Sequence, residues 1–167
     1  MKKWIYALFI LLAFAVPSCF AQGAKTYPGF SFAGKDYSFA GSKSYDDIWV
    51  NAYDTYGPLL IFTFGSSMNI DTSVKSQISR LEDEKREYLV MGSKTNVILA
   101  YLNSSSYVTI ERYTAGVNVS LDLVQLKEFN EAEILPYANE LKKLSIPAPI
   151  KEEVSVADAF DARRAQK

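Results

Sequence analysis

The chain has 167 residues, and its 18 Lys and Arg against 19 Asp and Glu give a formal net charge of −1. This balance excludes a polybasic nucleic-acid binder, which would concentrate positive charge to neutralise phosphates. The absence of histidine and the single cysteine exclude Ser-His-Asp and Cys-His catalysis, and we expect no metal site and no cofactor.

The N-terminal segment predicts a secretory signal peptide over residues 1–21. Two lysines precede an apolar run from Ile5 to Val16, which is shorter than the roughly 20 residues that span a bilayer. Cleavage after Ala21 would release a free chain, whereas the stretch VPSC partly matches a lipoprotein signal in which Cys19 carries the lipid. We therefore expect a periplasmic or extracellular protein, which is tethered to a membrane only if Cys19 is lipidated.

Residues 22–44 are rich in aromatic side chains and contain a local echo. FSFAG at 30–34 is followed by YSFAG at 37–41. The alternation predicts two short strands around the turn at 33–36, although an aromatic arm that packs on the surface explains the pattern equally well. In both cases this segment is an N-terminal arm that precedes the main domain.

The main domain is expected over residues 45–146, and its first half combines a hairpin with a helix. DIWVNAYD and LLIFTFGSS favour two strands that are joined near Gly57-Pro58. The following segment, Asp71 to Leu89, contains no Gly or Pro. Its apolar positions fall near one helical face, which predicts an amphipathic helix; these positions are Val74, Ile78, Leu81, Tyr88 and Leu89.

The second half of the domain reads as three strands and a second helix. NVILAYLN, YVTIERY and VNVSLDLVQL are separated by short polar turns, as in an antiparallel meander. NEAEILPYANELKKLSI follows as a helix whose firm part is expected to start near Pro136. Residues 147–167 carry balanced charges and few apolar groups, so we expect a flexible tail that is dispensable for folding.

This order predicts an α+β fold in which an antiparallel sheet of about five to seven strands packs with two main helices. The order of elements resembles that of PsbP/Mog1-like domains. The parts that carry the resemblance are the helix DTSVKSQISRLEDEKREYL after the early hairpin and the terminal helix PYANELKKLSI, within about residues 45–146. The resemblance implies a scaffold for protein docking rather than for catalysis.

Alternation within two strands suggests a binding surface. If the aliphatic side chains of DIWVNAYD and YVTIERY share one core, the residues between them line the opposite face as an aromatic platform with polar guides. Such rings suit sugar stacking and protein docking. The expected binding residues are Trp49, Asn51, Tyr53, Tyr107, Glu111 and Tyr113.

These patterns predict an exported, non-catalytic binding or assembly module of the cell envelope. It would act by protein docking or small-ligand binding, with a protein or a small ligand as its partner, without nucleic acid, and with a membrane only through a lipid anchor. The alternative is a carboxylate-based hydrolase that acts on carbohydrate. That activity needs two acids that face each other about 5–10 Å apart across a pocket.

Overall fold

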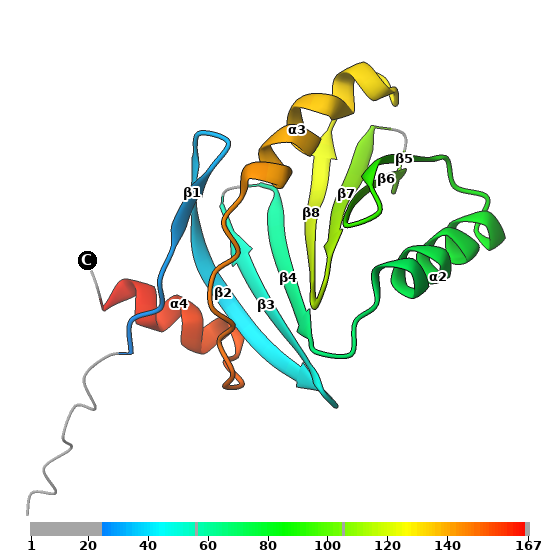
Figure 1. Ribbon diagram of the computed structural model, residues 1–167. Helices are drawn as coiled ribbons and strands as arrows, with labels where there is room; N and C mark the ends of the chain where they lie inside the picture. The colour runs from blue at the N-terminus through cyan, green and yellow to red at the C-terminus, as the bar shows by residue number, and fades with distance from the viewer. Residues whose placement is uncertain (1–24, 56, 105, 166–167) are drawn as a thin grey trace, which may run out of the picture.

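The computed structural model describes residues 25–55, 57–104 and 106–165, so the expected signal peptide and Cys19 lie outside the described residues. These residues form one antiparallel sheet and three helices (Figure 1). The strands are β1 (Phe30–Phe32), β2 (Lys35–Tyr45), β3 (Ile48–Asp54), β4 (Leu59–Gly65), β5 (Tyr88–Ser93), β6 (Asn96–Leu102), β7 (Tyr107–Thr114) and β8 (Val117–Gln125). The helices are α2 (Ile70–Asp83), α3 (Glu131–Lys143) and α4 (Val156–Arg164). The α+β prediction is confirmed.

The sheet has eight strands in the order β1-β2-β3-β4-β8-β7-β6-β5, rather than the five to seven that were expected. Two of the eight strands, β1 and β2, come from the N-terminal arm, where two short strands were predicted. β1 and β2 form a hairpin around Ala33 and Gly34, which adopt left-handed φ angles of 48° and 73°. β2 then continues along β3, so residues 35–45 belong to the sheet.

The strand that was not expected is β5, whose first two residues, Tyr88 and Leu89, were predicted as the end of the first helix. Helix α2 begins after Asn69, whose side chain caps the N–H of Thr72, and it ends at Asp83. Lys85 has a φ of 55°, and this left-handed residue turns the chain out of the helix. Tyr88 therefore begins a strand, although it still packs against the same apolar cluster as α2.

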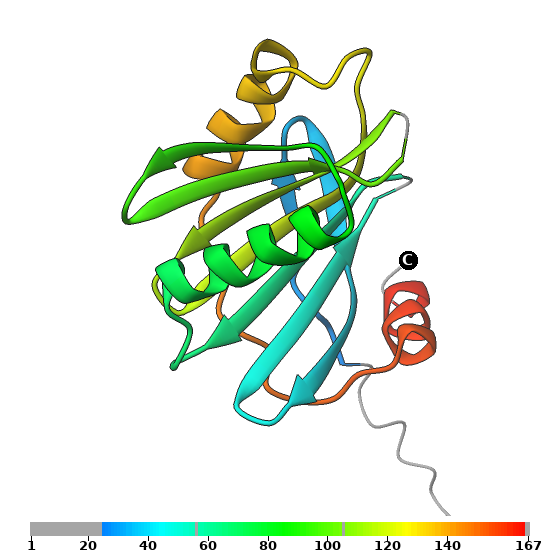
Figure 2. The same cartoon turned by 90° about the vertical axis from the view of Figure 1, so that its right-hand side faces the viewer.

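The two faces of the sheet carry separate apolar clusters. The face covered by α3, here called the α3 face, holds the larger one, with Phe62, Ile110 and Val119 packed against Ile134 and Leu141. The opposite α2 face holds a smaller cluster under α2, which lies across the near side of the sheet in Figure 2. The members of the smaller cluster are Val74, Leu81, Leu99, Tyr101 and Tyr113.

Helix α3 lies within the predicted segment 130–146, begins before the firm start that was expected near Pro136, and has hydrogen-bonding partners at both ends. It begins after Asn130, whose side chain accepts a hydrogen bond from the N–H of Glu133, and it contains Pro136 in its interior. At the other end, the Arg112 guanidinium donates to the carbonyl oxygens of Leu141 and Leu144 at 2.7 and 3.0 Å. Arg112 thus satisfies carbonyls that the end of a helix leaves without partners.

The C-terminal tail differs from its expected flexible state, because it packs on the sheet. The buried Asn51 side chain donates to the carbonyl of Ile150 and accepts from its N–H, at 3.0 and 2.7 Å. The backbone of Val154 then bridges Ser42 in β2. Backbone groups of the tail therefore take part in its attachment, together with the buried side chains of Val154 and Ala159.

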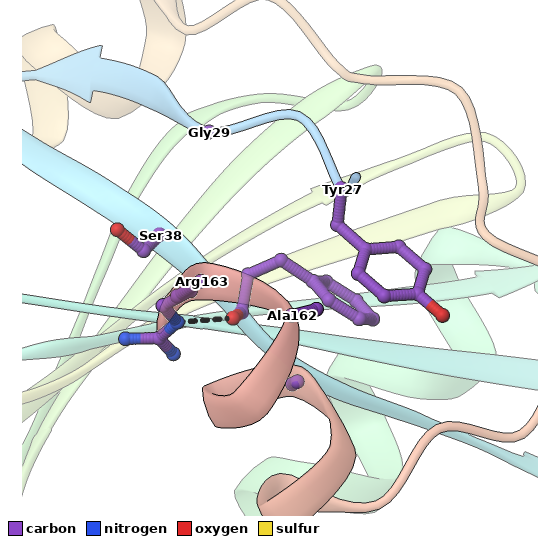
Figure 3. A pocket seen from close by; sticks show the side chains of 7 residues that line it. Tyr27, Gly29, Ser38, Ala162 and Arg163 are labelled. Atoms are coloured by element: carbon purple, nitrogen blue, oxygen red, sulfur yellow. Dashed lines mark hydrogen bonds between the residues drawn. The ribbon is translucent and has the colours of Figure 1, made fainter. Parts of the chain in front are cut away.

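Helix α4 completes the tail and lies along β2 (Figure 1). Arg163 donates to the carbonyl of Phe39 at 2.9 Å and forms an ion pair with Asp54 at 2.8 Å. Figure 3 shows the small hollow beside this contact, with Tyr27 and Arg163 among its lining residues. The rings of Tyr27 and Phe39 have their centroids 4.5 Å apart. The hollow has a volume of about 100 Å³, which is below that of typical ligand sites, so we assign it a packing role.

Candidate functional site

The regular pairing of β7 with β8 is interrupted by a bulge. Val108 pairs with Val124 and Ile110 with Leu121, so that Thr109 alone faces the two residues Asp122 and Leu123. Leu123 has a φ of 60° and is 50% exposed. A leucine in this left-handed region costs roughly 1–2 kcal/mol. Bulges redirect side chains and occur often beside functional sites, so this strained position marks a candidate site.

The bulge opens into a cleft of about 380 Å³, which we call the bulge pocket. This volume lies within the range of small-ligand sites. The pocket draws its walls from the end of α2 and from strands β4, β6, β7 and β8, which are distant in sequence. Its lining residues are Leu59, Arg80, Arg86, Tyr101, Asn103, Thr109, Asp122 and Leu123.

Hydrogen bonds hold one wall of the bulge pocket in place. Arg86 contacts Glu84 at 2.7 Å and donates to the Asn103 side-chain oxygen at 3.0 Å. The Asn103 amide in turn donates to the hydroxyl of Thr109. This chain links the end of α2 to β7 and fixes the donors and acceptors that face the cleft.

The second cation, Arg80, is less constrained. Its guanidinium lies 3.9 Å from a Glu84 oxygen and 6.0 Å from the centre of the Tyr101 ring, and its side chain is half exposed. The Asp122 carboxylate accepts a hydrogen bond from Ser120 at 2.9 Å. Glu84 thus contacts both guanidinium groups, and Asp122 is the second carboxylate at the cleft, so these four groups carry no net formal charge.

A buried carboxyl group adjoins the pocket on the same face of β7. Glu111 is 8% exposed, and it accepts a 2.5 Å hydrogen bond from Tyr113 and a longer one, at 3.5 Å, from Tyr101. Burial raises the pKa of Glu111 to about 7. The bond from Tyr113 opposes this rise, the charge of Asp122 adds to it, and Arg80 and Tyr101 oppose it.

The expected binding residues do not share a face. Pairing through β4 and β8 places Asn51 on the side of Phe62, Val119 and Arg112, which is the α3 face. Glu111 pairs with Ser120 and lies on the α2 face. The assumption of one shared core for both aliphatic sets is therefore wrong, because Val50 and Ile110 point to opposite sides.

The six residues consequently divide into three groups. Trp49, Asn51 and Tyr53 lie on the α3 face, where Asn51 and Tyr53 are fully buried and Trp49 packs against the core. Glu111 and Tyr113 lie under α2, next to the bulge pocket. Tyr107 stands at the start of β7 and is 42% exposed. Of the expected set, only Glu111 and Tyr113 lie beside the bulge pocket, and Tyr101 bonds to Glu111 there.

The residues that define the pocket were not identified from the sequence. Arg80 lies within the segment that was predicted as an amphipathic helix and Leu123 within the predicted strand VNVSLDLVQL, but neither was assigned a role in binding. The available signal was the dipeptide Leu123-Val124, in which two adjacent apolar residues break the alternation. Such a break is typical of a bulge.

A second cleft lies between β2, β3 and residues 153–158, with a volume of about 530 Å³. Its walls are mostly small or aliphatic, and its acidic groups already have partners. Glu153 accepts from Ser44 at 2.9 Å, and Asp158 accepts from Ser155 at 2.7 Å. It therefore offers fewer free groups for orienting a polar ligand than the bulge pocket does.

In residues 25–55, 57–104 and 106–165, no three His, Cys, Asp or Glu side chains are grouped in a way that would hold a metal ion. None of the helices in these ranges is both long and apolar enough to cross a membrane. Comparisons with protein-family models, curated proteins and solved structures find no match to this chain.

Proposed function

We propose that the protein is an exported, non-catalytic binding module that holds a small, neutral, hydroxyl-rich ligand in the bulge pocket. The observation that supports this most directly is the left-handed Leu123, which is half exposed at the pocket wall. Strain at such a position is retained only where surrounding structure enforces it, and strained positions cluster at ligand sites. Export follows from the N-terminal segment, with or without a lipid on Cys19.

The chemistry of the pocket indicates the class of ligand. Arg80 and Arg86 supply donors, Asp122 supplies acceptors, and the hydroxyl groups of Tyr101 and Thr109 do both. Glu84 does not line the pocket but pairs with both arginines, and together with Asp122 it balances the two guanidinium charges. The pocket therefore favours a neutral ligand over an anion or a cation. Two leucines, Leu59 and Leu123, provide apolar contact. A neutral carbohydrate has this combination of hydroxyl edges and apolar ring faces.

Small-ligand binding fits this geometry better than protein docking does. The expected aromatic platform was the main support for docking, and its members lie on different faces. The bulge pocket is concave and combines a few polar groups with apolar walls, as small-molecule sites do.

A carboxylate-based hydrolase is the second candidate, and one observation favours it. Glu111 and Asp122 interact on the α2 face of neighbouring strands, and the raised pKa of Glu111 suits a proton donor. However, Glu111 is buried, bonded to two tyrosines and not among the residues that line the pocket. Binding without turnover is therefore our first choice.

Calorimetric titration with neutral mono- and disaccharides, and with uronic acids as charged comparisons, tests the proposed ligand class. We expect neutral sugars to bind more tightly than uronic acids. Asp122→Asn should weaken binding at least tenfold, because a charged hydrogen-bond acceptor is lost. The control Asp83→Asn changes an exposed acid of α2 and should leave affinity unchanged.

Three outcomes of that titration are informative. Absence of binding across the panel, or an unchanged affinity in Asp122→Asn, would contradict the assignment. Release of cleaved sugar from a disaccharide by the wild-type protein would instead support the hydrolase.

Leu123→Gly removes both the backbone strain at residue 123 and the apolar side chain at the pocket wall, and the two losses have different expected effects. Glycine adopts a φ of 60° without strain, so we expect the free energy of unfolding to rise by about 0.5–1 kcal/mol. Sugar affinity should fall several-fold, because the pocket loses an apolar wall. Urea unfolding and the same titration measure both effects. A variant that is less stable and binds normally would show that Leu123 has a packing role only.

A further inference from the structure

The two edges of the sheet differ in how far other segments cover them. The outer edge of β2 is covered first by β1, then by the bridge from Ser42 to Val154, and α4 packs beside it. Covering an edge in this way prevents pairing with another chain. The tail thus closes one end of the sheet.

The opposite edge is formed by β5, which pairs with β6 and is the last strand in the sheet order. Within the described ranges, no strand pairs with its outer side. Its sequence, YLVMGS, contains no charged residue and no proline, and Val90 is 49% exposed. Natural edge strands are usually protected by charge, by proline or by a covering segment. β5 contains neither a charged residue nor a proline, and no described strand pairs with its outer side.

We propose that β5 pairs antiparallel with β5 of a second copy of this chain, about a two-fold axis near Val90 or Met91. The two sheets then form one continuous sheet across the axis. An interface of this kind is self-complementary, since the same strand contributes from both copies.

The charges at the ends of β5 favour this arrangement. Glu87 precedes the strand and Lys94 follows it. Antiparallel pairing brings Glu87 of each copy near Lys94 of the other, at both ends of the interface. Parallel pairing would bring like charges together instead, which is unfavourable for cross-strand neighbours.

The apolar residues of β5 also favour a second copy. Leu89 and Met91 pair with Ala100 and Ile98 and pack at the margin of the α3-face core, where both remain partly exposed. Across the axis they would meet their own counterparts, so that each apolar margin continues into the other. A partner with the same strand therefore fits both the charge pattern and the side-chain pattern.

The contact is expected to be weak and reversible. Stable interfaces bury about 1,200–2,000 Å² in total, and one short strand supplies less than that by itself. We therefore expect a monomer–dimer equilibrium that depends on protein concentration.

Analytical ultracentrifugation from about 1 μM to 1 mM tests the proposal at protein concentrations that bracket the micromolar to millimolar affinities of weak complexes. We expect dimers to form with rising concentration, and Val90→Lys to remove them by placing a charge on the edge. The matched control Val156→Lys lies at the opposite edge, where the side chain is 73% exposed, and should still dimerise. A monomer at every concentration, or dimers that persist in Val90→Lys, would overturn the proposal.

Cross-linking provides a second measurement that does not depend on Val90→Lys folding well. Residues that face each other across an antiparallel pair have Cα atoms about 4.5–5.5 Å apart, which suits a disulfide. In chains that carry Cys19→Ser, either Val90→Cys or Met91→Cys should form disulfide-linked dimers under mild oxidation, whereas Val156→Cys should not. Equal cross-linking at all three positions would indicate random collision and would contradict the proposed axis.

Discussion

Deletion of residues 147–167 is expected to lower the free energy of unfolding by at least about 3 kcal/mol. The deletion removes Ile150, which both donates to and accepts from the buried Asn51 side chain. A buried polar group that loses its partner costs about 1–3 kcal/mol, and Asn51 would lose two bonds. The 0% exposure of Asn51 holds with the tail in place, so after the deletion we expect water to reach its amide and to replace part of this loss.

Apolar contacts add to this loss. Val154 and Ala159 are buried in the core that also contains Phe39. The deletion removes both side chains, so the apolar area that they bury is lost. The ion pair of Arg163 with Asp54 contributes less, because both groups remain partly exposed. The newly free edge of β2 should also promote aggregation.

Thermal and urea unfolding of the shortened chain measure the effect. A loss of about 3 kcal/mol corresponds to a fall of roughly 10 °C in the midpoint for a domain of this size. Arg163→Ala is the control, and it should cost less than about 1 kcal/mol. A midpoint within about 5 °C of the intact chain would restore the expectation of a dispensable tail.

Much of this fold could be predicted from local patterns. The β1–β2 turn, the amphipathic character of α2 and the alternation in β7 follow from residue spacing, because each depends on neighbours in sequence. Which side chains of two separate strands share a face of the sheet does not follow from residue spacing. Asn51 and Glu111 lie on opposite faces because β4 and β8 separate their strands, and no local pattern specifies that order.

The packing of the tail and the residues of the bulge pocket could not be predicted from the sequence, because both depend on contacts between distant segments. Part of the attachment of residues 147–165 consists of hydrogen bonds from their backbone to Asn51 and Ser42, which composition does not reveal. In the pocket, Asp122 and Arg80 line the same cleft although they lie on β8 and α2, and the bulge that places Asp122 and Leu123 opposite Thr109 depends on strand pairing. Glu111 was identified from its place in β7, but its burial depends on α2 and on two tyrosines.

Glu111→Gln is expected to stabilise the protein at pH 8 by about 3 kcal/mol and to leave stability nearly unchanged at pH 4.5. Burial raises the pKa of Glu111 from 4.5 to about 7, and each unit is worth about 1.4 kcal/mol. Between these values the unfolded chain ionises while the folded carboxyl stays protonated. The contribution of this group to stability is therefore complete below about pH 4.5 and is lost as pH rises to about 7.

Urea unfolding of both proteins at steps between pH 4.5 and 8 measures this difference. Gln can still accept from Tyr113 and has no charge to desolvate, so the variant should lack the wild-type decline with pH. A second variant tests the same explanation, because the charge of Asp122 raises the pKa of Glu111. Asp122→Asn should accordingly shift the decline to lower pH, whereas the exposed control Glu82→Gln should leave it in place. A wild-type stability that is flat from pH 4.5 to 8, or a variant that is weaker at pH 8, would mean that Glu111 folds as a carboxylate held by its two tyrosines.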